Sequence, residues 1–210
     1  MEEEIAMSNP TQQEILHAID QGIRNAQRDY LKAFQSDIAS RYAPEYLMTM
    51  NIFQSLFELV DGYGLALEVP VYDIEGSSYT KFRGRKPGAV RLDGKCDLVL
   101  FNSEDKSRVV IEIKKDPWAY HEDMIRLIPL LKLGIEFSVF ASCLFKKTEG
   151  ELIEETQCLL DTIKNNYVKS GVTLSIELEP SAREPLYFEG DNEEWVWCPV
   201  IIKLQKIASD

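Results

Sequence analysis

The stretch "GKCDLVLFNSEDKSRVVIEIKK", residues 94–115, alternates apolar and polar positions in the manner of a β-hairpin. Valine, leucine and isoleucine dominate both of its arms, which is the composition of core strands. Even so, the arms carry two acids, Asp97 and Glu112, and the second arm ends at Lys114. Charged side chains need an explanation on strands whose other residues predict burial in the core, and the pairing of the two arms suggests one.

The pairing register of the hairpin decides how close the two acids lie. If residues 102–107 form the loop, Phe101 pairs with Arg108, and Asp97 then lies directly opposite Glu112. Opposed residues in an antiparallel pair have Cβ atoms about 4.5–5.5 Å apart. The sequence therefore predicts two carboxylates at one position of the sheet, provided that the register does not slip by a residue.

Because side chains on a strand alternate between the two faces, Asp97, Glu112 and Lys114 are predicted to share one face. Two carboxylates at this range repel each other unless one is protonated or a cation lies between them. Oxygen ligands of this kind suit a hard cation such as Mg²⁺ or Mn²⁺. The alternative is a buried ion network without a metal, which desolvation makes a poor source of stability.

A third acid is predicted to face the sheet from the helix that begins at Pro44. At 100° per residue, Glu45 falls on the apolar side of this helix, whereas Glu58 falls on the polar side. An acid on the apolar side needs a partner, so Glu45 joins the candidate site. The alternative is an acid in the first turn that the helix dipole favours.

The rest of the chain alternates between helical and strand periods, which predicts an α/β domain with a central mixed sheet flanked by helices. Pro129 is predicted to end or kink its helix. A helix or a helical pair is predicted over residues 11–41, and single helices over 44–61, 116–134 and 150–170. Further strands are predicted over 65–74, 136–145, 172–179 and 194–207.

The composition limits the class of protein. With 210 residues, of which 45% are hydrophobic, the chain is long enough to bury a core as one domain. A formal charge of -12 argues against general affinity for anionic polymers or membranes, although a local basic groove stays compatible with it. The four cysteines are scattered without metal-ligand spacing, and no apolar run reaches the roughly 20 residues of a membrane span. A cytoplasmic protein with reduced thiols is expected.

The acid in an early helix, the aspartate in "GKCDLVLF" and the Glu-x-Lys in "VVIEIKK" together resemble the PD-(D/E)xK nuclease superfamily. The resemblance covers residues 44–145, and Cys96 stands where that family often has a proline. It implies a restriction-endonuclease-like core within residues 44–210, preceded by a helical arm over residues 1–43. The helical arm and the C-terminal strands leave a homodimer open.

The resemblance also implies a function. In that superfamily the counterparts of Asp97 and Glu112 bind one or two Mg²⁺ or Mn²⁺ ions, often with help from the helix acid, here Glu45. The counterpart of Lys114 assists the attacking water. The expected function is therefore a metal-dependent endo- or exonuclease, with DNA as the expected polymer. The alternative is a catalytically idle nuclease-fold protein that binds nucleic acid or protein, which the acidity of the chain favours.

A basic segment, "KFRGRKPGAVR", leads into the Asp97 strand in an otherwise acidic chain. Phosphate contacts by Lys and Arg supply most of the sequence-independent affinity for nucleic acids, so this segment is a candidate nucleic-acid contact. An ordinary solvated loop is the equally weighted alternative. The residues concerned are Lys81, Arg83, Arg85, Lys86 and Arg91.

Overall fold

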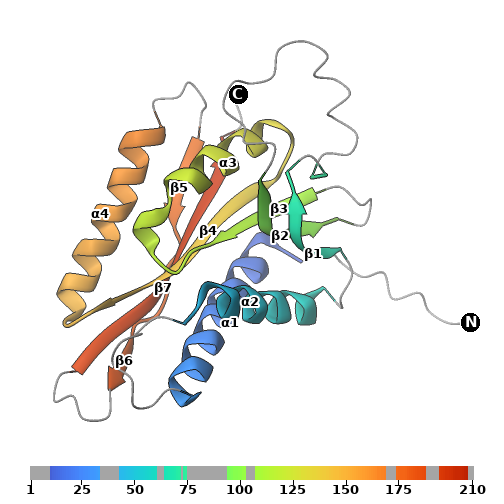
Figure 1. Ribbon diagram of the computed structural model, residues 1–210. Helices are drawn as coiled ribbons and strands as arrows, with labels where there is room; N and C mark the ends of the chain where they lie inside the picture. Colours follow the sequence, from blue (N-terminus) through green and yellow to red (C-terminus); the bar gives the residue numbers. More distant parts are fainter. Residues whose placement is uncertain are drawn as a thin grey trace, which may run out of the picture.

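The computed structural model describes residues 10–33, 43–60, 64–71, 73–74, 94–102, 107–168, 174–187 and 194–207. Within these ranges the protein is an α/β domain built on a mixed sheet of seven strands, in the order β1-β2-β3-β4-β7-β5, with β6 paired to β7 (Figure 1). The strands are β1 (Leu65–Pro70), β2 (Lys95–Phe101), β3 (Ser107–Ile113), β4 (Phe137–Lys146), β5 (Leu174–Leu178), β6 (Glu184–Tyr187) and β7 (Glu194–Lys206).

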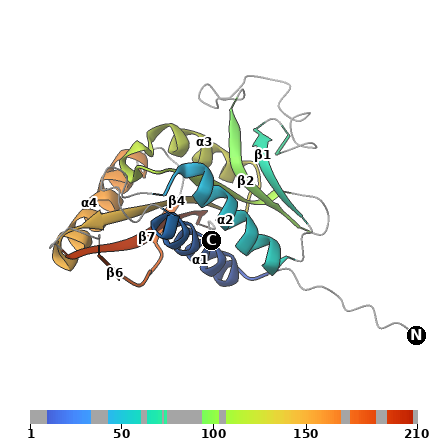
Figure 2. The same cartoon turned by 60° about the horizontal axis from the view of Figure 1, so that its bottom comes forward.

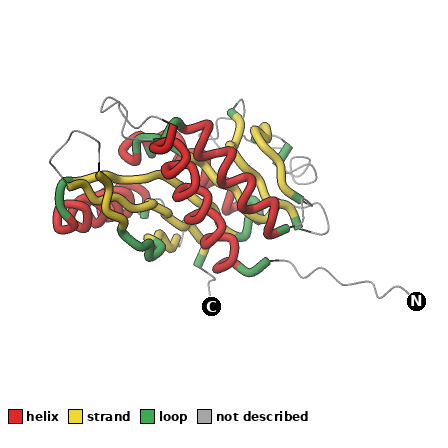
Figure 3. Tube along the Cα trace, turned by 90° about the horizontal axis from the view of Figure 1, so that it is seen from below, coloured by secondary structure: helices red, strands yellow, loops and turns green. Residues whose placement is uncertain are grey.

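Helices cover both faces of the sheet. On one side α1 (Gln12–Ala33) and α2 (Glu45–Leu59) lie against each other over the strands, as Figures 2 and 3 show. On the other side lie α3 (His121–Lys132), which follows the short 3₁₀ helix η2 (Pro117–Ala119), and α4 (Glu149–Tyr167). The sheet therefore separates two hydrophobic clusters, and the α/β architecture with flanking helices that the sequence predicts is confirmed.

The strands β3 and β4 are parallel, whereas the other neighbouring strands pair antiparallel. A parallel pair needs a crossover connection, and η2 with α3 provides it. The chain thus leaves the end of β3 and returns through α3 on one face of the sheet. This path brings Glu112 and Lys114, at the end of β3, close to the side chains of α3.

The hairpin of β2 and β3 has the predicted register along its middle, where Leu98 pairs with Ile111 and Leu100 pairs with Val109. The prediction is wrong beside the loop, because a β-bulge shifts the register by one residue and Phe101 pairs with Ser107. The bulge stays at the loop end of the hairpin, and the paired residues end at Leu98 and Ile111, so the predicted pairing of Asp97 with Glu112 lies just beyond the regular ladder.

One alternative for Pro129, an end of the helix, is contradicted, and one strand lies outside the predicted set. The helix α3 runs through Pro129 to Lys132, because Leu130 and Leu131 are buried and their packing outweighs the hydrogen bond that a proline removes. The strand β6 was not predicted, since four residues beginning Glu-Pro carry little strand signal without the neighbouring β7.

Helix α1, expected as an arm, belongs to the same hydrophobic cluster as α2 and the strands β3, β4 and β7. Its residues Ile15, Ile19 and Ile23 are fully buried. Close contact with α2 depends on Gly22, because a Cβ atom added there would lie 2.5 Å from the Cα atom of Ile52. Glycine is thus the residue that lets the two helix backbones approach.

We expect Gly22→Ala to lower the free energy of unfolding by about 1–3 kcal/mol, the usual cost of overpacking, as measured by urea denaturation. Gly150→Ala is the matched control. Gly150 also lies in a helix, but an added Cβ would find its nearest neighbour, Thr148 Oγ1, at 4.0 Å. The control should be neutral or slightly stabilising. Equal urea midpoints for the two variants would contradict the close contact.

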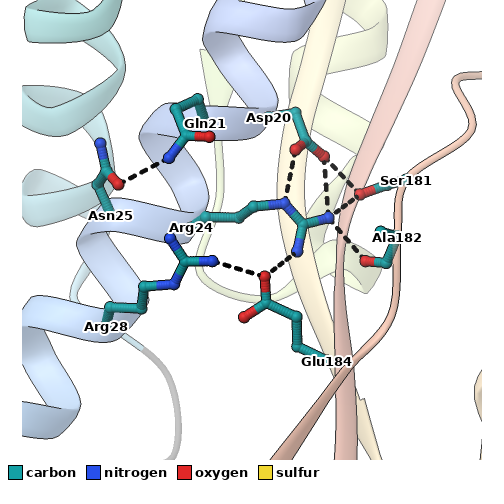
Figure 4. A network of polar contacts seen from close by, with 8 residues as sticks. All are labelled: Asp20, Gln21, Arg24, Asn25, Arg28, Ser181, Ala182 and Glu184. Carbon is teal, nitrogen blue, oxygen red and sulfur yellow. Dashed lines mark hydrogen bonds and ion pairs between the residues drawn. The ribbon is translucent and has the colours of Figure 1, made fainter.

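A buried arginine ties α1 to the segment that leads into β6 (Figure 4). The side chain of Arg24 donates from Nε to Asp20 at 2.6 Å, from Nη1 to Glu184 at 2.7 Å, and from Nη2 to the Ala182 carbonyl at 2.6 Å. Its guanidinium carbon also lies 5.7 Å from the centre of the Trp197 ring. The polar groups of Arg24 are therefore satisfied although the residue is only 5% exposed.

In the part of the chain that the structure describes, no helix is long and apolar enough to cross a membrane.

Candidate active site

Charged side chains from four elements converge at the end of β3, between α2 and α3. The members of this cluster, called here the acid cluster, are Glu45 of α2, Asp97 of β2, Glu112 and Lys114 at the end of β3, and Asp123 and Arg126 of α3. The first four are the residues that the sequence predicts to form one site.

The strand β2 is irregular at Asp97. The pairing of β1 with β2 skips this position, and Glu68 opposite has a φ of +49°, in the left-handed region. As a result, Cys96 packs in the cluster on the α3 side while Leu98 packs on the α1 side, so the alternation assumed from the sequence is broken here. Asp97 accepts a 2.7 Å hydrogen bond from the Ile113 N–H.

Glu112 is the most constrained carboxylate of the acid cluster. It is fully buried, and its Oε1 accepts a 2.5 Å charged hydrogen bond from Arg126 Nη1. Its Oε2 has no hydrogen-bond partner among the described residues. Burial and the neighbouring Asp97 raise the pKa of Glu112 to about 8, against the opposing charge of Arg126. One oxygen of this carboxyl group is thus anchored by Arg126, and at neutral pH the metal-free group mostly holds a proton beside Asp97.

Lys114 lies between acids from the two sides of the sheet. Its Nζ is 3.2 Å from Glu45 Oε1 and 3.9 Å from Asp123 Oδ2. Burial lowers the pKa of Lys114, but the charges of Asp123, Glu45 and Asp97 outweigh it, and the net shift is upward. Lys114 therefore stays an ammonium at neutral pH, which suits it to stabilising negative charge and not to accepting a proton.

Glu45 faces the end of β3, as its place on the helix predicts. Besides the contact with Lys114, its Oε2 accepts a 3.3 Å hydrogen bond from the backbone N–H of Lys115. Its side chain stays 43% exposed, and Glu58 on the polar side of the same helix is exposed as well. Glu45 thus holds the lysine in place and lies at the solvent-facing edge of the acid cluster.

Asp123 and Arg126 complete the acid cluster on the α3 side. Asp123 is 1% exposed, and burial raises its pKa to about 6. The sequence indicates Asp123 and Arg126 only as an i, i+3 pair on a helix. In the structure their charged groups lie 3.7 Å apart. That Arg126 reaches Glu112 follows from the packing of α3 on the sheet, which no local pattern encodes.

The donor chemistry can be compared with that of a hard divalent cation. Four carboxylates and two cationic groups form the acid cluster, so when all are ionised two negative charges are uncompensated. Among the described residues, however, no three Asp, Glu, His or Cys side chains are grouped so that they could hold a metal. Mg²⁺ often takes only one or two protein carboxylates and completes its shell with water and phosphate oxygens. A site of that kind would draw its protein oxygens from Asp97 and Glu112, because Glu45 is held by Lys114.

Comparison with known protein families, with curated proteins and with solved structures finds no match to this chain. The interpretation of the acid cluster therefore depends on its geometry and on the motif in the sequence. The predicted nucleic-acid contacts at Lys81, Arg83, Arg85, Lys86 and Arg91 lie outside the described residues.

The acid cluster should make stability depend on pH. A carboxyl group whose pKa is raised from 4.5 in the unfolded chain to about 8 stabilises the fold fully below about pH 4.5, and this contribution is lost as pH rises through about 8. We expect the metal-free protein to lose up to about 1.4 kcal/mol per pH unit from Glu112 in this window, in urea melts from about pH 5.5 to 8.5. Glu112→Gln should flatten this slope. A slope identical in parent and variant would contradict the buried, proton-binding carboxylate.

Proposed function

We propose that this protein is a metal-dependent nuclease of the PD-(D/E)xK type that hydrolyses phosphodiester bonds, with DNA as its polymer. The observation that supports it most is the pair of carboxylates from adjacent strands, Asp97 and Glu112, with the ammonium of Lys114 beside them. The order of elements agrees with the motif: the helix with Glu45, the two site strands, then helix α3 and strand β4. We infer a restriction-endonuclease-like core from the same order.

Hydrogen bonds from other parts of the chain orient the carboxylates of Asp97 and Glu112. The Ile113 N–H orients Asp97, and Arg126 binds Oε1 of Glu112, while Oε2 has no hydrogen-bond partner in the part of the chain that the structure describes. Carboxylates that ligate a metal are usually held by such hydrogen bonds. A bound Mg²⁺ or Mn²⁺ would polarise the phosphoryl oxygen and acidify a coordinated water. Asp97 and Glu112 would supply the protein oxygens for that ion.

The role of Lys114 follows from its charge. As an ammonium held by Glu45 and Asp123, it can donate to an oxygen on which negative charge develops during attack at phosphorus. It does not remove the proton of the water while it stays charged. Glu45 acts through Lys114 as a positioning residue at the edge of the site.

The direct test is cleavage of plasmid DNA and of oligonucleotides in the presence of Mg²⁺ or Mn²⁺. The parent protein should cut and Glu112→Gln should not, since the variant keeps the shape of the side chain but loses its charge. Glu177→Gln is the matched control, because Glu177 is an exposed strand glutamate paired with Lys203 at the far side of the sheet. Absence of cleavage by the parent with every metal would refute the catalytic proposal.

A second candidate is a nuclease-like protein that binds without turnover, and one observation favours it. The 2.5 Å contact with Arg126 already supplies Glu112 with a cation, and the chain as a whole has a formal charge of -12. Calorimetric titration with Mn²⁺ separates the two candidates. Metal binding that Asp97→Asn abolishes supports the nuclease, whereas no heat of binding in the parent supports the idle protein.

A further inference from the structure

A groove of about 710 Å³ opens beside the acid cluster, between α2 and the strands β1 and β2. Two of its lining residues, Glu45 and Asp97, belong to the acid cluster itself. A second part of its wall is apolar and is formed by Tyr46, Met50 and Leu67. The groove therefore joins Asp97 and Glu45 of the acid cluster to a nonpolar surface large enough for a ring.

The apolar wall is unusually exposed for large side chains. Tyr46 is 71% exposed and Met50 is 49% exposed, and as i, i+4 neighbours on α2 they form one continuous face. Isolated exposed apolar residues are common on protein surfaces and need no explanation. Here, however, both side chains line the same groove as two carboxylates of the candidate site.

The charges of the groove restrict the class of ligand that it can bind. Its charged lining residues are the three acids Glu45, Glu68 and Asp97, and none of the described residues that line it is basic. Glu45 is paired with Lys114 at 3.2 Å and Glu68 with Lys95 at 2.8 Å, so a phosphate group on this wall would meet the charge of Asp97 and no cationic lining residue. An uncharged planar ring would not be repelled, and it would gain contact with the tyrosine ring and the methionine thioether.

We propose that this groove holds an unpaired nucleobase of the substrate strand, stacked on Tyr46, while the adjoining phosphodiester lies at Asp97 and Glu112. The proposal rests on the nuclease function above and adds the class of substrate. In a duplex each base is paired and stacked between its neighbours, so its face is not free to meet Tyr46. The substrate is accordingly a strand with unpaired bases at the point of cutting, such as a single strand or a frayed end.

The test is fluorescence anisotropy with a labelled single-stranded oligonucleotide and with the duplex of the same sequence, both in the presence of Mn²⁺. The protein is the slow-cleaving Lys114→Ala variant, which keeps both proposed metal ligands, and binding is read before cleavage proceeds. The parent of this series should bind the single strand more tightly than the duplex. Adding Tyr46→Ala should weaken single-strand binding about 5- to 150-fold, the range for loss of one stacked base. Adding Tyr46→Phe should retain the affinity, because phenylalanine keeps the aromatic face.

The matched control is Phe57→Ala, which removes a 42% exposed aromatic residue of the same helix that does not line the groove. It should leave the affinity for the single strand unchanged. Equal losses in Phe57→Ala and Tyr46→Ala, or no loss in Tyr46→Ala, would overturn the proposal. So would a preference for the duplex, or a Tyr46→Ala effect on self-association alone in sedimentation velocity, which would assign the face to a second copy of the chain.

The outcome for the groove can be told apart from the outcome for the nuclease function. If the parent protein cuts DNA and Glu112→Gln does not, while Tyr46→Ala binds and cuts single strands like the parent, the nuclease function stands and the base-binding groove is refuted. If the parent neither binds nor cuts any nucleic acid, both proposals fall together.

Discussion

Lys114→Ala should slow DNA cleavage about 10²–10³-fold while leaving the affinity for Mn²⁺ within a few-fold of the parent. The reason is that the Lys114 ammonium lies beside the carboxylates without ligating a metal, so its removal weakens stabilisation of the developing charge and not the binding of the ion. Cleavage under single-turnover conditions gives the rate, and calorimetry gives the affinity.

Two variants make this result specific to Lys114. Lys132→Ala removes an exposed lysine at the end of α3 and should cleave like the parent. Glu45→Gln should give a smaller loss of rate than Lys114→Ala, since Asp123 still holds the ammonium. If Lys114→Ala cleaved at the parental rate, the lysine would be a structural ion-pair partner and the proposed role would be wrong.

Arg24→Met should lower the free energy of unfolding by about 3 kcal/mol, at the lower end of the cost of opening a buried ion pair. The substitution keeps an apolar stem over Trp197 but leaves Asp20 and Glu184 without their buried partner. These two carboxylates are 18% and 28% exposed, so water recovers part of the loss. Urea denaturation followed by circular dichroism measures the change.

Lys32→Met is the control for Arg24→Met. Lys32 belongs to the same helix and pairs with Asp29 at 3.6 Å, but both side chains are largely exposed. Exposed pairs of this kind contribute about 0–1 kcal/mol, so this variant should unfold close to the parent. A comparable loss in the two variants would show that the buried network does not hold α1 to the sheet.

The parts of the fold that the sequence predicts are those with a local period. Alternation of apolar residues predicts the arms of the hairpin, a loop taken over residues 102–107 predicts the register at Leu98 and Ile111, and the helical wheel places Glu45 toward the sheet. All three depend only on neighbours within one element or one hairpin. For this reason the four residues of the motif could be placed near each other before any tertiary contact was known.

The features that the sequence did not predict depend on contacts between distant segments. The irregularity at Asp97 comes with a left-handed Glu68, a residue type without a preference for that conformation. The bond from Arg126 to Glu112 requires α3 to pack back onto the sheet, and β6 forms only beside β7. In the same way the sequence predicts the amphipathic face of α1 but not that Ile52 of α2 packs against it at Gly22.

The central claim is that Asp97 and Glu112 share a divalent cation, and a crystal soaked in Mn²⁺ tests it most directly. The account predicts an anomalous difference peak within about 2.0–2.4 Å of one oxygen of each carboxylate, with Arg126 still bound to Oε1 of Glu112. A crystal that shows no manganese peak there, with Glu112 bound by Arg126 alone, would contradict it.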